Sequence, residues 1–285
     1  MTSILVGIDG SERGRRALDW AVRRARRDNA SITMLAVVDQ AIANKAGVDV
    51  ETVCATVRRA LAAKRAAAAS EYPGISITAQ VLVGDIVDAL VDAADEHDMI
   101  VLGSHHGHTI GETIGGAKGL RVSVSTKVPT VIVPADWDAA NHGKGIVVGV
   151  GPDERVSAGA IEFGAKEALI RNQKLELVSA WGIPAWLERS AQAMGGGLGP
   201  VGEQRQRELD AQVARLQSEH PNLQVEGRSL EGASPSRVLV ETSRNSNLLV
   251  MGTNSRNALG RTLFGSVTHS VLLNLTIPTV IVPQV

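Results

Sequence analysis

The chain contains the same series of short segments twice, in the same order. Three pairs of segments correspond at a nearly constant offset: ILVGIDG (Ile4–Gly10) with IVVGVGP (Ile146–Pro152), VLGSHHG (Val101–Gly107) with VMGTNSR (Val250–Arg256), and VPTVIVP (Val128–Pro134) with IPTVIVP (Ile277–Pro283). Such a repeat indicates that one structural unit occurs twice. At 285 residues, each copy is long enough to bury a core of its own. We therefore interpret the chain as a tandem duplication.

Each copy alternates short runs of β-branched residues with longer helical patterns. The strands expected in the first copy are Ile4–Ile8, Ser31–Val38, Ile77–Val83, Met99–Gly103 and Thr130–Val133. Those expected in the second copy are Ile146–Val150, Leu175–Trp181, Val225–Leu230, Leu248–Met251 and Thr279–Ile281. Strands that alternate with helices predict a parallel sheet with helices on both faces. The predicted fold class is α/β, with a first domain over residues 1–135, a polar linker over 136–145 and a second domain over 146–285.

The composition narrows the classes of partner. A net charge of −1, from 29 basic and 30 acidic residues, provides no field to attract nucleic acid or an anionic membrane. Cys54 is the only cysteine, so no intrachain disulfide can form and a reducing compartment is expected. The sequence shows no signal-peptide pattern and no apolar run of about 18 residues that could span a membrane. We expect a cytoplasmic protein with no nucleic-acid or membrane partner.

The last strand of each copy is flanked by prolines, as PTVIVP. Because proline cannot donate to a β-ladder, this pattern is typical of an edge strand. An uncharged edge of TVIV invites pairing with another strand unless it is covered. We expect the two copies to pair these edges across a pseudo-twofold axis as an intrachain pseudo-dimer, and a homodimer of the whole chain is a further possibility to test.

A ligand site is expected where strands one and four end. In open parallel sheets, ligands bind outside the carboxyl ends of the strands, where the strand order reverses. In the first copy, strand one leads into Asp9-Gly10-Ser11, and strand four leads into Gly103–Gly107 with a helix start expected at Gly115–Lys118. Glycine lets a backbone approach a phosphate closely, and a helix N-terminus favours anions. The sequence therefore predicts a ligand that carries phosphate.

These features resemble the universal stress protein family. The resemblance rests on a strand followed by Asp, a G-x2-G-x9-G-[ST] pattern after strand four and a last strand that opens with proline. It covers nearly the whole chain twice, as in the tandem form common in actinobacteria. It implies two tandem five-stranded parallel sheets, each in the order 3-2-1-4-5. It also implies ATP binding, with the Asp near the adenosine, the backbone after strand two against the adenine, and the glycine segment around the phosphates.

Each copy keeps a different part of the family's pattern. The candidate nucleotide-binding residues of the first copy are Asp9, Val37, Gly103, His106, Gly116 and Lys118. Those of the second copy are Gly151, Gly252, Ser255, Gly265, Ser266 and Thr268. The first copy has His106 in place of the second glycine and Ala117 in place of the hydroxyl residue; Lys118 could partly compensate by placing a positive charge near the phosphates. The second copy has Ser255 in place of the second glycine and Gly151 in place of the Asp.

Several candidates also have a purely structural interpretation. Asp9 precedes a helix start and could act as its N-cap, and Ser266 or Thr268 could cap the last helix. Gly103 and Gly252 could be turn glycines. His106 stands with other histidines on one loop without the carboxylate or cysteine pattern of a metal site, so solvated histidines and no metal are expected.

The leading hypothesis is a cytoplasmic stress-response protein that binds ATP, with or without Mg²⁺, without catalysis. It would act through nucleotide-dependent changes in assembly or in the binding of an unknown protein partner. The alternative is an interaction and dimerisation module that binds no nucleotide. We find no general base, nucleophile or metal-binding carboxylate pair near the glycine segments, so we expect no dedicated enzyme, although slow hydrolysis of bound ATP stays open.

Overall fold

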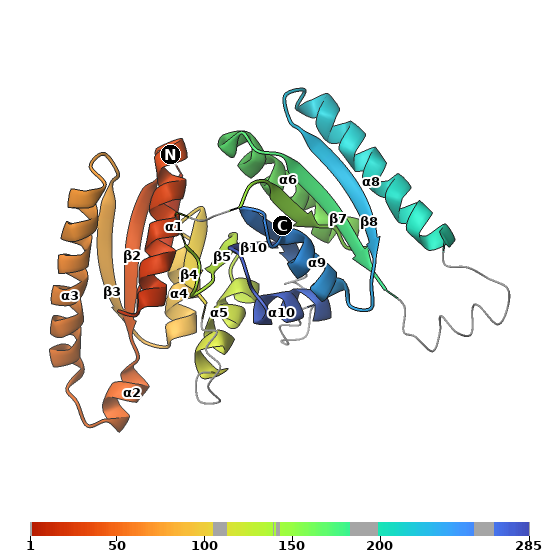
Figure 1. Ribbon diagram of the computed structural model, residues 1–285. Helices are drawn as coiled ribbons and strands as arrows, with labels where there is room; N and C mark the ends of the chain where they lie inside the picture. The colour runs from red at the N-terminus through yellow and green to blue at the C-terminus, as the bar shows by residue number, and fades with distance from the viewer. Residues whose placement is uncertain are drawn as a thin grey trace. The chain divides into compact units, whose positions relative to one another are not determined.

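The computed structural model describes residues 2–104, 113–138, 140, 143–182, 199–253 and 265–284 (Figure 1). The chain divides into two compact units between Ala140 and Asn141. Each unit has a parallel sheet with helices on both faces, which confirms the predicted fold class. No helix in the described residues is both long enough and apolar enough to cross a membrane.

The strands of the first unit follow the predicted pattern closely. They are β1 (Ser3–Gly7), β2 (Ser31–Val38), β3 (Ile77–Val83), β4 (Met99–Gly103) and β5 (Thr130–Val133). Within this unit their order is β3-β2-β1-β4-β5, and all neighbours pair in parallel. This is the order that the family resemblance implied. β5 lies at the end of its unit's strand order, where its flanking prolines had placed it.

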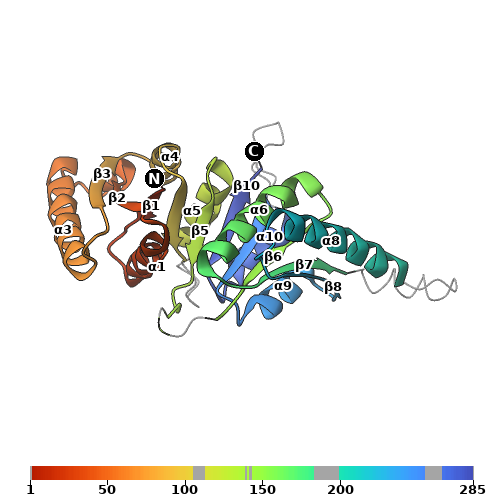
Figure 2. The ribbon, with the colours of Figure 1, turned by 90° about the horizontal axis from the view of Figure 1, so that it is seen from above.

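Helices cover both faces of the first sheet. They are α1 (Glu12–Asp28), α2 (Gln40–Lys45), α3 (Val50–Glu71), α4 (Ile86–Ala94) and α5 (Thr113–Ser125). Figure 2 shows α1 on one face of the sheet, and α4 and α5 on the other. The central strand is therefore buried on both sides, and Ile4, Leu5 and Val6 of β1 are completely buried. This explains why β1 is a continuous apolar run and does not alternate.

The second unit repeats the arrangement. Its strands are β6 (Ile146–Gly149), β7 (Leu175–Trp181), β8 (Val225–Glu231), β9 (Leu248–Thr253) and β10 (Thr279–Pro283), in the order β8-β7-β6-β9-β10. Its helices are α6 (Glu154–Arg171), α8 (Gly199–Glu219), α9 (Pro235–Ser243) and α10 (Ser266–Leu273). Neighbouring strands pair in parallel here too. The expected pairing between β5 and β10 stays a prediction.

The first helix of each unit is capped at both ends in the same way. Ser11 caps α1 by accepting a hydrogen bond from the Gly14 amide, and Asp153 caps α6 by accepting from the amides of Arg155 and Val156. Each helix then ends at an asparagine in the left-handed region, Asn29 or Asn172. Asparagine tolerates this conformation better than most residues. These residues therefore set where α1 and α6 begin and end.

Two local predictions were incomplete. The helix after β4 begins at Thr113, earlier than the start expected at Gly115–Lys118. The glycines in this stretch are poor helix formers and hid its first turn from a pattern search. Helix α2 was not predicted, because six residues with little periodicity give almost no signal.

Candidate functional site

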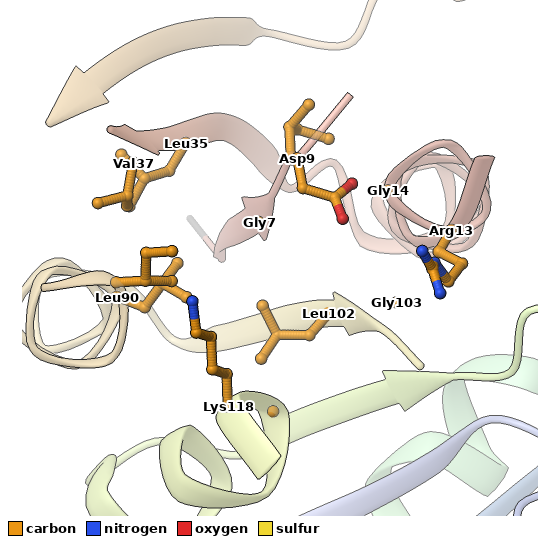
Figure 3. A pocket seen from close by; sticks show the side chains of 13 residues that line it. Gly7, Asp9, Arg13, Gly14, Leu35, Val37, Leu90, Leu102, Gly103 and Lys118 are labelled. Atoms are coloured by element: carbon orange, nitrogen blue, oxygen red, sulfur yellow. The ribbon is translucent and has the colours of Figure 1, made fainter. Parts of the chain in front are cut away.

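A cavity opens in the first unit where β1, β2 and β4 end. Its volume is about 270 Å³, and α1, α4 and α5 complete its walls (Figure 3). Four of the residues proposed from the sequence line it: Asp9, Val37, Gly103 and Lys118. The strand order brings them together from four separate segments, because the ends of β1 and β4 are adjacent where the order reverses.

Asp9 is fixed in the loop between β1 and α1. Its Oδ1 accepts hydrogen bonds from the Ser11 amide at 3.0 Å and from the Ser11 hydroxyl at 2.5 Å. Desolvation acts to raise the pKa of Asp9, but the hydrogen bonds from Ser11 outweigh it and lower the pKa below the usual aspartate value. Asp9 is therefore an ionised acceptor at neutral pH. The capping interpretation needs correction: Ser11 is the N-cap of α1, and Asp9 holds that serine in place.

Gly103 has a packing role that the sequence did not settle. A Cβ atom at this position would lie 2.5 Å from the backbone oxygen of Arg13, which is far inside the van der Waals limit. The first turn of α1 therefore presses directly on the end of β4. Gly14 makes a similar approach on the other side of the turn, where a Cβ would lie 3.0 Å from Oδ1 of Asp9. The glycine at position 103 would be needed with or without a phosphate nearby.

Lys118 brings a positive charge into the cavity from α5. Figure 3 shows its side chain rising from the helix toward Leu90, into the space between the strand ends and α4. Its ammonium group forms no ion pair or hydrogen bond with any residue that the structure describes. Among the described residues its charge acts on Asp85 without forming an ion pair, so the ammonium group is available to an anionic ligand.

Sequence reasoning missed part of the cavity wall. Arg13 lines it from the first turn of α1, and Ile86 and Leu90 line it from α4. The apolar face of α4 was visible as a helical pattern, but a pattern does not say which cavity a face will border. Arg13 is one of several arginines in α1, and nothing in the sequence separates it from the others.

Of the two remaining candidates of the first unit, the structure describes only Gly116. Gly116 lies within the first turns of α5 and not at the expected helix start. His106 falls outside the described residues. Within those residues, no group of three or more His, Cys, Asp or Glu side chains could hold a metal ion. Cys54 is a free, buried thiol.

In the second unit the candidates are arranged around the ends of β6 and β9. Gly252 repeats the packing of Gly103, since a Cβ there would lie 2.2 Å from the backbone oxygen of Val156. Gly151 follows β6, and its backbone amide donates a hydrogen bond to the Ser157 hydroxyl at 3.1 Å. Asp153, the nearest carboxylate, is engaged as the N-cap of α6. The second unit thus has no counterpart of the Asp9 carboxylate at the end of its first strand.

The hydroxyl positions of the second unit differ from each other in exposure. Gly265 is the N-cap of α10, so neither Ser266 nor Thr268 caps this helix, in contrast to the structural interpretation of the sequence. Ser266 is exposed in the first turn, whereas Thr268 is only 6% exposed. Only Ser266 is therefore freely accessible to a ligand. Ser255 lies outside the described residues.

Comparison with known proteins identifies the family of the chain. The model of the universal stress protein family matches residues 1–134 and again residues 144–283. The chain belongs to the universal stress protein family. A universal stress protein of Mycolicibacterium smegmatis is 26% identical over 98% of this chain and 96% of its own length. Universal stress protein Rv2005c of Mycobacterium tuberculosis is also 26% identical, over 99% of this chain and 97% of its own length.

The fold of a solved universal stress protein matches the full length. The crystal structure of a universal stress protein from Archaeoglobus fulgidus superposes with a TM-score of 0.77 at 16% identity, covering 99% of this chain and 96% of that one. At this level of identity the match shows the shared fold. The tandem arrangement of two universal stress protein domains is thus established for this chain by sequence and by fold.

Proposed function

We propose that the first unit binds an adenine nucleotide without catalysis, and that this cytoplasmic stress protein acts through nucleotide-dependent changes in partner binding or assembly. The observation that carries the proposal is the position of the Lys118 ammonium group, which has no ion pair with any described residue, in the same cavity as the Asp9 carboxylate, where β1 and β4 end. This is the place where open parallel sheets bind ligands. The family resemblance adds the expectation of ATP.

The cavity offers matching chemistry for each part of a nucleotide. Leu35, Val37, Leu90 and Leu102 provide an apolar wall for a base. Asp9, ionised and held by Ser11, can accept hydrogen bonds from ribose hydroxyls. Ala117 stands in the position of the family's hydroxyl residue and cannot donate a hydrogen bond to phosphate. The positive charge of Lys118 can attract the phosphate instead. At about 270 Å³, the cavity is sized for the base and ribose, with the phosphates directed outward.

The first unit is the stronger candidate for the occupied site. The second unit keeps Gly252, Gly265 and Ser266, but Gly151 offers no carboxylate for a ribose. We therefore propose one nucleotide per chain. We further propose that the boundaries of the two domains lie at residues 1–135 and 146–285, on either side of the polar linker.

The alternative function, an interaction module without nucleotide, draws support from one specific observation. Gly103 and Gly252 are both explained by contact with the first helix of their unit. If these glycines serve only packing, the motif would persist without a ligand.

Calorimetric titration of ATP and of Mg-ATP into the full chain tests the proposal. We expect saturable binding to one site, and a roughly ten- to hundredfold weaker affinity in Lys118→Met and Asp9→Ala, because each loses a charged interaction with the ligand. Lys127→Met is the matched control, since Lys127 pairs with Asp95 outside the cavity and should leave binding unchanged. Loss of binding with Ser266→Ala alone would move the site to the second unit. No binding at millimolar ATP would favour the interaction module.

A further inference from the structure

We infer that the second unit has a binding site for an aliphatic carboxylate in a cleft between α6 and α8. The cleft has a volume of about 780 Å³, within the range of small-molecule sites. Its floor includes the end of β7, and its walls are the facing sides of the two helices, which lie on the same side of the sheet (Figure 2).

This cleft lies on the face opposite to that of the nucleotide cavity. In the first unit Leu35 of β2 lines that cavity and pairs in register with Gly7. The corresponding residue in the second unit is Val178, which pairs with Gly149. Ser179, the next residue, lines the cleft. Because successive side chains of a strand point to opposite faces, the cleft opens on the other face of the sheet from the counterpart of that cavity, and the two share only the loop after β6, where Gly151 lines the cleft.

Ser179 supplies the first sign that a ligand belongs here. It is only 4% exposed, and its side chain lines the cleft. Its hydroxyl forms no hydrogen bond with any described residue. This oxygen is not one of the buried side-chain atoms that lack a hydrogen-bond partner, so it counts as a contact offered to a ligand in the cleft and not as a buried unsatisfied group. The corresponding residue in the first unit is Ala36, so the hydroxyl is not required by the fold.

Arg205 supplies the second sign. Its Nε is buried without a hydrogen-bond partner, and the residue lines the cleft from α8. Lys166 and Arg215 also line the cleft, but they are paired with Glu162 at 2.7 Å and Glu219 at 3.1 Å. Arg205 forms no ion pair with the residues that the structure describes. A guanidinium group with free donors is suited to a carboxylate.

The other charges in the cleft limit the ligand to a single negative charge. Glu154 and Glu208 line it as well, and neither forms an ion pair within the described part of the chain. Two carboxylates beside one available guanidinium would repel a di- or triphosphate. The site therefore suits a monoanion and does not duplicate the nucleotide site.

The remaining lining is apolar. Ile161 and Ala165 of α6 face the cleft from one side, and Leu209 and Leu216 of α8 from the other. They extend along both helices away from Arg205, toward the helix ends. A hydrocarbon chain placed there would lie against aliphatic side chains while its carboxylate meets Arg205 and Ser179. In the first unit, by contrast, α1 and α3 meet through Arg26 stacked over Tyr72, 5.5 Å from the ring centroid.

Calorimetric titration of sodium decanoate into the full chain tests this site. We expect saturable 1:1 binding that is at least about tenfold weaker in Arg205→Gln and clearly weaker in Ser179→Ala, since each removes a donor to the carboxylate. Acetate, which lacks the chain, and decanol, which lacks the charge, should bind more weakly than decanoate. Arg207→Gln is the matched control, because Arg207 lies on the same helix, pairs with Glu203 and does not line the cleft.

Decanoate that binds to neither the wild type nor the control overturns the inference. It is also overturned if Arg205→Gln and Ser179→Ala bind decanoate as tightly as the wild type does, with thermal unfolding confirming that both variants are folded. Binding of ATP in these variants separates this result from the nucleotide proposal, because both should bind ATP as the wild type does.

Discussion

The two units carry different polar side chains at the same place in the fold, just before the fourth strand. In the first unit this residue is Asp98, whose carboxylate accepts hydrogen bonds from the Ser3 amide at 2.7 Å and the Ser3 hydroxyl at 2.9 Å. In the second it is Asn247, whose amide side chain accepts from Nη1 of Arg171 at 2.8 Å and donates to the Gly143 carbonyl at 3.2 Å. The backbone geometry is kept, but a titratable exposed group has been exchanged for a neutral buried one.

The same contrast extends to the ion pairs at the end of each unit's first helix. Arg171 pairs with Glu167 at 2.9 Å, and both side chains are almost completely buried, at 3% and 2% exposure. In the first unit Arg24 pairs with Asp28 at 2.6 Å, with exposures of 5% and 18%. A duplicated fold can thus preserve its sheet while the polar groups at its ends diverge. The residues proposed for ligand binding, at the carboxyl ends of the strands, also differ between the units.

The largest effect is expected from breaking the buried pair of the second unit. Arg171→Met would remove the buried ion pair with Glu167 and the hydrogen bond to Asn247, and should destabilise this unit by about 3–5 kcal/mol. Arg24→Met should cost less, because Asp28 can reach water. Urea denaturation measures both. The double variant Glu167→Met/Arg171→Met should recover much of the loss; equal costs for Arg24→Met and Arg171→Met would contradict the contrast between the units.

A second prediction concerns the close contact between a glycine and the first helix, which both units share. Gly103→Ala and Gly252→Ala should each destabilise the protein by about 1–3 kcal/mol, because the added Cβ meets the backbone of the first helix. Gly265→Ala is the matched control from the same motif, since no described residue lies within 4 Å of its Cβ position. Thermal unfolding checks all three. Unchanged stability in Gly103→Ala and Gly252→Ala would show that these glycines serve a ligand and not the packing.

The smallest effect is a pH dependence confined to the first unit. Hydrogen bonds from Ser3 lower the pKa of Asp98, so its contribution to stability is present above the unfolded-state value of about 3.9 and is lost as the pH falls through the folded-state value. Because Asp98 is exposed, the contribution should be less than about 1 kcal/mol. Melting curves of wild type and Asp98→Asn should differ at pH 7, and the difference should shrink progressively as the pH falls below about 4. A constant difference across this range would argue against the titration of Asp98.

Most of the fold could be predicted from the sequence, because the repeat and the apolar runs mark every strand. The bounds of β2, β3, β4, β5 and β7 agree with the prediction residue for residue. Helix α5 was less predictable, since its glycines disguise its first turn.

The candidate site was predictable only in part. Asp9, Val37, Gly103 and Lys118 line one cavity because the strand order brings their segments together, and that order came from the family resemblance. Arg13, Ser179 and Arg205 could not be found, because which side chain faces an opening depends on helix rotation and strand register. The short-range role of Ser11 as a cap was also hidden by the more conspicuous Asp9.

The contact between Gly103 and the first turn of α1, repeated at Gly252, affects how nucleotide binding is inferred from the sequences of relatives. A glycine that a fold needs for close packing will be retained by descendants that have lost their ligand. Counting such glycines across relatives would then overestimate how many of them bind nucleotide. Asp9 and Lys118, whose positions are taken by Gly151 and Val267 in the second unit, would be the better markers of a nucleotide site.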